Sequence, residues 1–288
     1  MNAKQLKWVY LFILSLIWGS SFILIKKGLV GLSALQVGSL RIIFAALFLL
    51  LIGFRSLAKI QRIQWKYIAI TSVLGTFLPA YLFAIAETEI DSSTTGILNS
   101  LTPLITLVLG VLVFGIMAQR RQIIGVFIGL IGSGLLVFSG AMNHPDQNYY
   151  YALLVLIACF CYALNVNLIK KYLSDLNSLS ITTGNFTILV VPASIVLLTT
   201  NFSEVVDVAE VQHSLFFILI LGIVGTGIAN IIFFKLIQMS SPVFATSVTY
   251  LIPIVACFWG FFDGELLSPY QLLGALVVLV GVFLSARK

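Results

Sequence analysis

The sequence predicts an all-α polytopic membrane protein with ten transmembrane helices, arranged as two inverted five-helix repeats. Three observations lead to this fold class: the composition, a series of long apolar segments, and an internal repeat. Of 288 residues, 60% are hydrophobic and only 9% are charged. Soluble domains carry about 25% charged residues. A chain this apolar cannot cover a water-facing surface, so lipid must be its outer solvent.

Ten apolar segments can be marked along the chain, and each is long enough to cross about 30 Å of hydrocarbon at about 1.5 Å per residue. The first five cover residues 8–27, 34–54, 66–86, 93–114 and 122–139. The second five cover residues 149–170, 179–200, 214–234, 242–262 and 269–286. The connections between them are short, so we expect no additional soluble domain.

The charged residues predict the orientation of the chain. With the N-terminus in the cytoplasm and alternating spans, 13 of the 16 basic residues fall on the cytoplasmic side. They are Lys4, Lys7, Arg55, Lys59, Arg62, Lys66, Arg120, Arg121, Lys170, Lys171, Lys235, Arg287 and Lys288. Cytoplasmic loops of membrane proteins are enriched in Lys and Arg. We therefore expect both termini in the cytoplasm.

The stretch 83–103 recurs at 233–253, so that Phe83 aligns with Phe233 and Pro103 with Pro253 at an offset of 150. Near the starts of the two halves, Ile25-Lys26-Lys27 matches Ile169-Lys170-Lys171 at an offset of 144. Positions related in this way are called twins below. The repeat predicts two units, residues 1–140 and 141–288. Because each has an odd number of spans, the second must be inverted, with a site at the seam near mid-membrane.

Two motifs resemble those of a known family. Trp18-Gly19-Ser20-Ser21-Phe22 and the segment from Gly264-Glu265 to Gly274-Ala275 resemble signatures of EamA-type carriers in the drug/metabolite transporter superfamily. The resemblance covers nearly the whole chain and implies ten helices and the export or exchange of small metabolites. One departure is that Gly115 stands at the twin position of Glu265.

Polar residues inside spans are the candidates for substrate binding, since polar side chains facing lipid are costly. Several are twins, such as Trp18 with Tyr162 and Ser21 with Asn165. The alternative for each is a polar contact that only holds helices together. The predicted substrate-binding residues are Trp18, Ser21, Arg41, Tyr81, Asn99, Tyr162, Asn165, Asn185, Asn230 and Tyr250.

Arg41 is the one charge well inside a predicted span, about 10 Å from its outer edge. At this depth the side chain can extend outward to the lipid headgroups. The other hypothesis is that Arg41 neutralises a carboxylate or phosphate of the substrate.

Glycine and proline residues within spans are candidates for gating. Proline removes a backbone hydrogen bond and kinks a helix, either as a static bend or as a hinge. The twin placement of Pro103 and Pro253 favours hinges, with Gly96 and Gly225 nearby. Glycines of the fifth and tenth segments form small faces that favour close helix contact, so the chain is expected to be a monomer or a homodimer.

Several function classes find no support in the sequence. No Asp or Glu lies deep in a span, and Glu87, Glu89 and Glu265 are expected to be solvated near outer ends, which leaves proton coupling unsupported. We expect no catalytic residues, metal or cofactor, because no nucleotide-binding loop or residue cluster indicates one. No basic face indicates nucleic-acid binding. Cys159, Cys161 and Cys257 lie in apolar runs and are expected to pack there.

The sequence thus predicts a secondary transporter in a bacterial inner (plasma) membrane, with the bilayer and a small-molecule substrate as its partners. We expect it to export or exchange small metabolites such as amino acids by alternating access. A nucleotide-sugar or cationic drug carrier is the alternative. A membrane-embedded enzyme would need a catalytic cluster, and a channel a continuous polar lining, and neither is visible.

Overall fold

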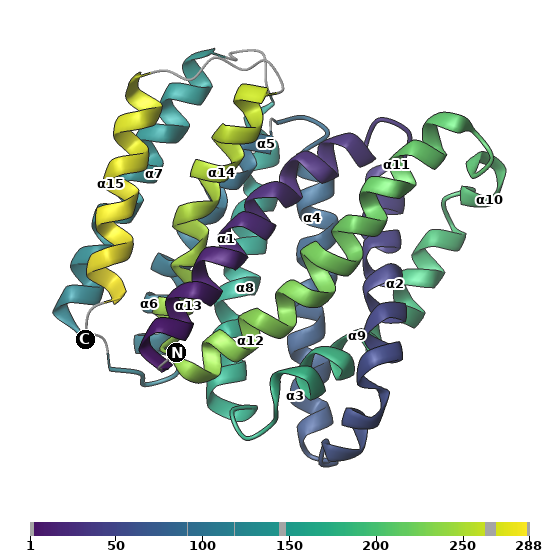
Figure 1. Ribbon diagram of the computed structural model, residues 1–288, viewed down its shortest axis with the longest axis horizontal. Helices are drawn as coiled ribbons and strands as arrows, with labels where there is room; N and C mark the ends of the chain where they lie inside the picture. Colours follow the sequence, from purple (N-terminus) through teal and green to yellow (C-terminus); the bar gives the residue numbers. More distant parts are fainter. Residues whose placement is uncertain (1–2, 91, 118, 144–147, 263–268, 287–288) are drawn as a thin grey trace.

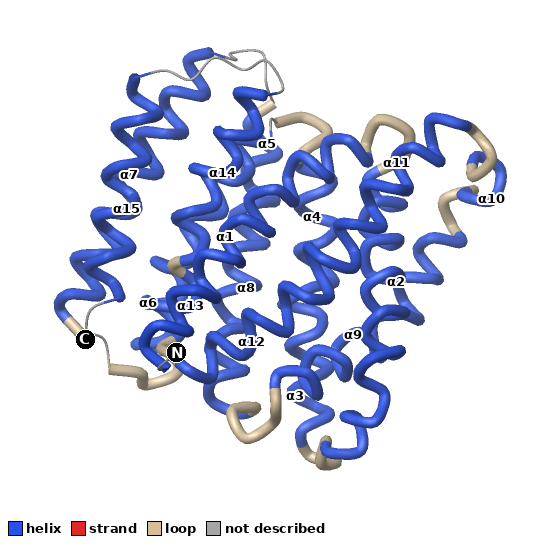
Figure 2. Tube along the Cα trace, viewed as in Figure 1, coloured by secondary structure: helices blue, strands red, loops and turns tan. Residues whose placement is uncertain are grey.

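The computed structural model describes residues 3–90, 92–117, 119–143, 148–262 and 269–286, and this part of the chain forms helices joined by short connections (Figures 1 and 2). The elements of the first half are α1 (Ala3–Gly28), α2 (Ala34–Gly53), η1 (Phe54–Lys59), α3 (Gln64–Ser72), η2 (Val73–Phe77), α4 (Leu78–Ala86), α5 (Ser92–Leu98), η3 (Asn99–Leu101), α6 (Thr102–Leu112) and α7 (Arg120–Asn143).

The second half follows a similar order. Its elements are η4 (Tyr149–Tyr151), α8 (Ala152–Tyr172), α9 (Ser178–Leu198), α10 (Phe202–Val205), α11 (Ala209–Ile220), η5 (Leu221–Ile228), α12 (Ala229–Met239), α13 (Pro242–Thr246), α14 (Val248–Phe262) and α15 (Pro269–Ala286). The first turn of α1 and the last turn of α15 lie toward the same end of the bundle in Figure 1.

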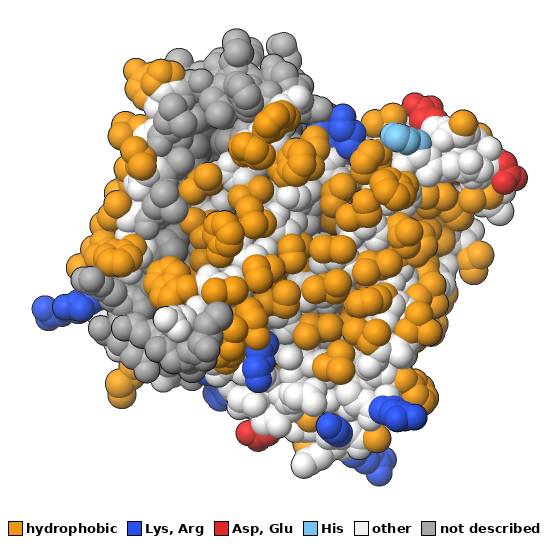
Figure 3. Space-filling model, viewed as in Figure 1, with side chains coloured by type: hydrophobic (Ala, Val, Ile, Leu, Met, Phe, Trp, Pro, Cys, Tyr) orange, Lys and Arg blue, Asp and Glu red, His pale blue; other side chains and the backbone are white. Residues whose placement is uncertain are grey.

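Six helical stretches of the described residues are long and apolar enough to cross a membrane. They cover Gln5–Gly28, Ala34–Lys59, Gln64–Ala86, Ala152–Tyr172, Ser178–Leu198 and Ala209–Met239, and shorter apolar helices cover Asn99–Leu112 and Pro242–Ala256. Large apolar side chains such as Leu51 and Leu198 are more than 80% exposed. The face in Figure 3 is hydrophobic over the middle of the helices, as expected for a surface that meets lipid.

Polar caps begin twin helices of the two halves. The Ser33 hydroxyl accepts the backbone N–H of Gln36 at 3.3 Å at the start of α2, and the Gln36 amide oxygen accepts the Ser33 N–H at 2.9 Å. At the start of α9, the Asn177 side chain accepts the Ser180 N–H at 2.7 Å. Each cap satisfies a backbone donor that would otherwise have no partner.

The third and eighth predicted spans contain π-helical segments at twin positions. The segments are η2 and η5, and Gly75-Thr76 of the first aligns with Gly225-Thr226 of the second. A π-helical turn carries an extra residue and disturbs the regular ladder of hydrogen bonds, and such turns are frequent at functional sites. Both segments lie beside the candidate site described below.

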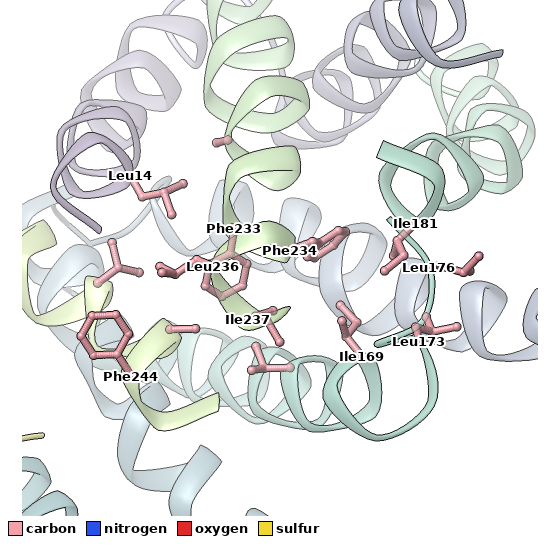
Figure 4. Packing of buried hydrophobic residues seen from close by; sticks show 14 of the residues in the cluster. Leu14, Ile169, Leu173, Leu176, Ile181, Phe233, Phe234, Leu236, Ile237 and Phe244 are labelled. Atoms are coloured by element: carbon pink, nitrogen blue, oxygen red, sulfur yellow. The ribbon is translucent and has the colours of Figure 1, made fainter. Parts of the chain in front are cut away.

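Contacts between the halves follow the repeat. Helix α2 packs on its twin α9, and α7 packs on its twin α15. Helix α1 packs on α14, and their twins α8 and α6 pack on each other in the same way. Figure 1 shows α7 and α15 side by side at one edge of the molecule. Several helices contribute to one apolar cluster of the core, and Figure 4 shows its members Leu14 on α1, Phe234 on α12, Ile169 on α8 and Phe244 on α13.

Candidate functional site

A cavity of about 70 Å³ lies between the two halves. This free space is enough for a few water molecules. Its lining residues come from helices of both halves: Trp18, Ser21, Phe22, Ile25, Arg41, Gly75, Thr76, Phe83, Asn99, Thr102, Tyr162, Asn165, Val166, Thr226, Asn230, Phe233, Thr246, Thr249 and Ile252.

Apolar clusters lie on both sides of the cavity along the helices. On α1, Leu14 belongs to the cluster of Figure 4, Phe22 belongs to a second cluster, and Trp18 between them packs against both. On α8, Cys159 belongs to the second cluster and Ile169 to the first. The cavity therefore lies between two apolar clusters of the core.

Arg41 reaches the cavity from α2 and is held there by the second half. Its Nε donates a hydrogen bond to Thr226 Oγ1 at 2.8 Å, and Thr226 lies in the π-helical segment η5. The backbone carbonyl of Thr226 accepts a further hydrogen bond from Asn230 Nδ2 at 2.9 Å. The side chain thus points between the halves, which contradicts the interpretation that Arg41 extends outward to the headgroups.

Aromatic rings form the apolar part of the lining. Trp18 Nε1 donates to the Gly225 carbonyl oxygen at 3.0 Å, and the Trp18 ring meets Phe233 edge-on with centroids 4.8 Å apart. Phe83 stacks with Tyr162 at 5.9 Å and meets Phe22 edge-on at the same distance. The indole N–H therefore fixes the ring of Trp18 between the two halves, as is usual for buried tryptophan.

Buried amide side chains complete the lining. The Thr102 hydroxyl lies 2.7 Å from the Asn99 carbonyl oxygen and 3.2 Å from Asn99 Oδ1. Asn165 on α8 packs directly against the backbone of Gly75, where a Cβ atom would overlap its amide group. Asn165 Oδ1 has no hydrogen-bond partner among the described residues. An acceptor of this kind next to a cavity is costly to leave unpaired.

Seven of the ten predicted substrate-binding residues line this cavity: Trp18, Ser21, Arg41, Asn99, Tyr162, Asn165 and Asn230. The structure brings them together from segments that are as far apart as α1 and α12. It shows their geometry, and their role in binding stays a prediction.

The other three predicted residues lie elsewhere. Tyr81 packs on Gly38, and its hydroxyl lies 2.9 Å from Ser39 Oγ at the contact of α2 and α4. The ring of Tyr250 packs on Gly129 of α7, and its hydroxyl donates to the Val126 carbonyl oxygen at 3.3 Å.

Asn185 is the third residue outside the cavity, although it is the twin of Arg41. Its side chain does not line the cavity and instead accepts a hydrogen bond from Thr71 Oγ1 of the first half at 3.2 Å. Thr76, the twin of Thr226, is left with a hydroxyl that has no partner among the described residues.

The predicted gating residues lie close to the cavity. The carbonyl oxygen of Gly225 accepts the hydrogen bond of the Trp18 indole N–H. Gly96 lies against Phe22 and Ile252 of the lining. Pro103 stands in the first turn of α6, where it removes no internal hydrogen bond, whereas Pro253 lies inside α14. The twin prolines therefore differ in their local effect, and their gating role stays a prediction.

Sequence reasoning missed several lining residues, chiefly Phe22, Phe83, Phe233, Thr76, Thr102, Thr226 and Thr246. A signal for four of them was present. Phe83 with Phe233 and Thr76 with Thr226 are identical twins in the repeat. Phenylalanine was missed because only polar residues were selected as candidates. Threonine was missed because its hydroxyl can bond to a carbonyl oxygen of its own helix, so its presence in an apolar span does not by itself indicate a site.

Glu87 corrects another expectation. It was expected to be solvated, but both carboxylate oxygens are buried and have no hydrogen-bond partner among the described residues. Burial raises the pKa of the Glu87 carboxyl well above its ordinary value, while the nearby cations Arg41 and Lys26 act in the opposite direction. Glu265, which was expected to be solvated too, lies outside the described residues.

A second hollow of about 480 Å³ lies toward the other end of α8, beyond the cluster of Figure 4. Its polar lining includes Asn167, Gln122, Lys170 and Ser241. Lys170 Nζ donates to the carbonyl oxygens of Ile237, Gln238 and Ser240 at 2.8–3.3 Å and so caps the end of α12. This hollow lies toward the side to which the sequence assigns most basic residues.

Comparison with known proteins shows relatives over almost the whole chain. It is 25% identical to the uncharacterized transporter YoaV of Bacillus subtilis over 276 residues, covering 94% of this chain and 93% of the relative. It is 27% identical to the uncharacterized inner membrane transporter YedA of Escherichia coli, with 95% and 88% covered. It is 26% identical to an S-adenosylmethionine/S-adenosylhomocysteine transporter of Chlamydia trachomatis, with 87% and 79% covered.

A solved crystal structure shares the fold, with a TM-score of 0.74 at 14% identity and 96% of this chain covered. The model of the EamA-like transporter family matches residues 6–138 and again residues 150–287. These two matches include most of the chain and all the residues that line the cavity. The chain is therefore a multi-pass integral membrane protein that belongs to the EamA-like transporter family.

Proposed function

We propose that this chain is a secondary carrier that moves small metabolites, amino acids first among them, by alternating access across a bacterial inner membrane. The observation that carries the proposal is the cavity formed jointly by both halves, with Arg41 of the first half bonded to Thr226 of the second. A substrate in this position would contact both halves, so its binding would be coupled to their relative movement.

The proposed topology has ten spans, both termini in the cytoplasm, and inverted repeats of residues 1–140 and 141–288. The twin packing of α2 with α9 and of α7 with α15 supports a pseudo-two-fold axis between the halves. The orientation is supported by the Lys and Arg residues, most of which lie at one end of the visible face in Figure 3.

The chemistry of the lining favours a substrate with an anionic group. Among the lining residues that the structure describes, Arg41 is the only charged one, and the amides and hydroxyls around it can hydrogen-bond an ammonium or a polar substituent. An amino acid meets both requirements. A relative named for S-adenosylmethionine keeps larger amino-acid derivatives in the candidate class. Nucleotide sugars remain the second candidate, and a cationic drug finds no negative partner among the described residues of this lining.

The function can be tested by counterflow in proteoliposomes that contain the purified protein. Vesicles loaded with unlabelled compound are exposed to labelled amino acids, a nucleotide sugar or a cationic drug in turn. A carrier gives saturable uptake that is accelerated by the internal compound. Labelled compound that enters without saturation would indicate a channel, and no exchange with any amino acid would contradict the proposed substrate class.

Two asparagines form a matched pair for the site. Asn165 and Asn185 are both buried, but only Asn165 lines the cavity. Asn165→Ala is expected to raise the KM of the exchanged compound about tenfold, the effect of losing about 1.4 kcal/mol of binding. Asn185→Ala should leave KM unchanged even where it lowers stability. Equal changes in KM for both variants would contradict the assignment of the cavity.

The orientation can be tested by cysteine labelling from outside intact cells. Arg120 and Lys235 are exposed and are assigned to the cytoplasmic side. Arg120→Cys and Lys235→Cys should both be protected from a membrane-impermeant thiol reagent until the cells are opened. Labelling of only one of them in intact cells would overturn the inverted repeat.

A further inference from the structure

Glu87 follows the last residue of α4, at the end of the bundle assigned to the outside. Part of the residue is exposed, but its two carboxylate oxygens are fully covered and lack hydrogen-bond donors among the described residues. A carboxylate in water or at a helix end normally finds several donors. A buried carboxyl group without them is more stable in its neutral, protonated form.

The charges that act on Glu87 come from other helices. Arg41 on α2 and Lys26 on α1 are its cationic neighbours, and of the two Arg41 has the larger effect. Helix α8, which packs against α4, contributes Tyr162 and Cys159, which are uncharged in their ordinary state at neutral pH. Tyr81 on α4 itself is hydrogen-bonded to Ser39.

Arg41 connects Glu87 to the central cavity. The same guanidinium that acts on Glu87 lines the cavity and is bonded through Nε to Thr226. When Glu87 is ionised, its negative charge compensates Arg41, and the cavity attracts anions weakly. When Glu87 carries a proton, the charge of Arg41 is uncompensated and attracts an anionic group into the cavity.

From this arrangement we infer that Glu87 is a proton-binding site whose charge state controls the charge that Arg41 presents to cargo in the central cavity. The inference rests on the proposed carrier function and adds an energy-coupling group to it. By linkage, a proton on Glu87 and an anionic group at Arg41 favour each other's binding, so the two would travel in the same direction. The coupling involves only a proton from water and no covalent step.

Infrared difference spectroscopy of the protein in lipid nanodiscs tests the site without any substrate. The C=O stretch of a protonated carboxyl group is followed as the pH is raised. Wild-type protein and Glu89→Gln, which alters an exposed acid two residues away, should show a band that disappears with a midpoint well above that of an ordinary glutamate. Glu87→Gln should lack this band. A band of equal intensity in Glu87→Gln would overturn the assignment.

The link to Arg41 is tested by the midpoint of the same band. Arg41→Gln removes the larger opposing charge, so it should move the midpoint to higher pH, and Lys26→Gln should move it less in the same direction. An unchanged midpoint in Arg41→Gln would overturn the coupling. If Glu87→Gln does not fold, Glu87→Asp serves instead, and it should keep a titrating band with a shifted midpoint.

Counterflow then connects the site to transport. With the labelled amino-acid mixture, the wild-type exchange rate should change with pH through the midpoint seen in the infrared titration, and the rate of Glu87→Gln should not. Identical pH profiles would overturn the role in coupling. Absence of exchange in all proteins at all pH values would instead contradict the proposed function, while the infrared result would still decide whether Glu87 binds a proton.

Discussion

Replacing Gly75 with alanine tests how closely the π-helical segment η2 packs against α8. The added Cβ would overlap the amide group of Asn165, closer than real Cβ atoms approach any neighbour. Asn165 is 2% exposed, so its side chain has little room to move away. Overpacking of this kind costs about 1–3 kcal/mol. The gain from alanine over glycine in a helix, about 0.5–1 kcal/mol, offsets only part of it.

Two other glycines at the cavity provide graded controls. In Gly225→Ala the new Cβ meets Ser21 Oγ at 2.9 Å and Leu221 Cδ1 at 3.0 Å, and both are ends of side chains that can shift. In Gly96→Ala the nearest atoms, on Phe22 and Ile252, lie at 3.5–3.6 Å, which is ordinary contact. We expect Gly75→Ala to be clearly destabilised, Gly225→Ala less so, and Gly96→Ala to be neutral or slightly stabilised.

The assay is thermal unfolding of each purified variant in the same detergent. A change of 1 kcal/mol corresponds to a Tm shift of about 2–4 °C in soluble proteins of comparable size. The Tm should fall in the order Gly96→Ala, Gly225→Ala, Gly75→Ala. In the double variant Gly75→Ala with Asn165→Ala, part of the loss should be recovered because the overlapping amide is gone. A wild-type Tm for Gly75→Ala, or no recovery in the double variant, would refute the reasoning.

Three further predictions concern the charged groups. Because burial raises the folded-state pKa of Glu87 above its unfolded value of about 4.3, the stability it provides is present at low pH and is lost as the pH rises through the folded pKa. Glu87→Gln should therefore have a higher Tm than wild type in alkaline buffer and a similar Tm near pH 4, and a constant difference would contradict this. Arg41→Lys keeps the positive charge but loses the Nε donor to Thr226, so the KM measured by counterflow should rise about tenfold. An unchanged KM would show that the charge alone is sufficient for binding the substrate. Lys170→Met removes three hydrogen bonds at the end of α12 and should destabilise the protein by about 1–3 kcal/mol in chemical unfolding, with Lys171→Met as the control.

The fold class was largely predictable because lipid imposes a simple rule on the sequence. Apolar segments of about 20 residues must be helices, and they can be read without knowledge of their neighbours. Interruptions inside a span were harder to predict. The segment 93–114 was expected to be one helix, but it divides into α5, η3 and α6, and η2 and η5 are π-helical. Such local changes depend on packing against other helices.

The candidate site was predictable where twin residues are both polar and both point to the seam. Trp18 with Tyr162 and Ser21 with Asn165 meet this condition and line the cavity. Tyr250 lies outside the cavity and bonds to Val126 of α7, because the polarity of a residue does not show which side of its helix it occupies. Sequence position also misplaced Glu87, because it gives the distance from the end of a span but not the direction of the side chain.

The difference between the twins Arg41 and Asn185 bears on the proposed alternating access, in which the two halves exchange their conformations. Identical inverted halves would give two end states of equal energy, since each is the other turned over. Here Arg41 makes a charge-assisted hydrogen bond to Thr226 across the halves, a bond worth about 1.5–3 kcal/mol, while Asn185 makes a neutral hydrogen bond with Thr71 across the halves, worth about 0.5–1.5 kcal/mol. Because about 1.4 kcal/mol corresponds to a tenfold population change, a difference of about 1 kcal/mol between the two bonds would favour one end state several-fold. A proton on Glu87 would alter this preference through Arg41, and the asymmetry of the repeat would then give the carrier its dependence on pH.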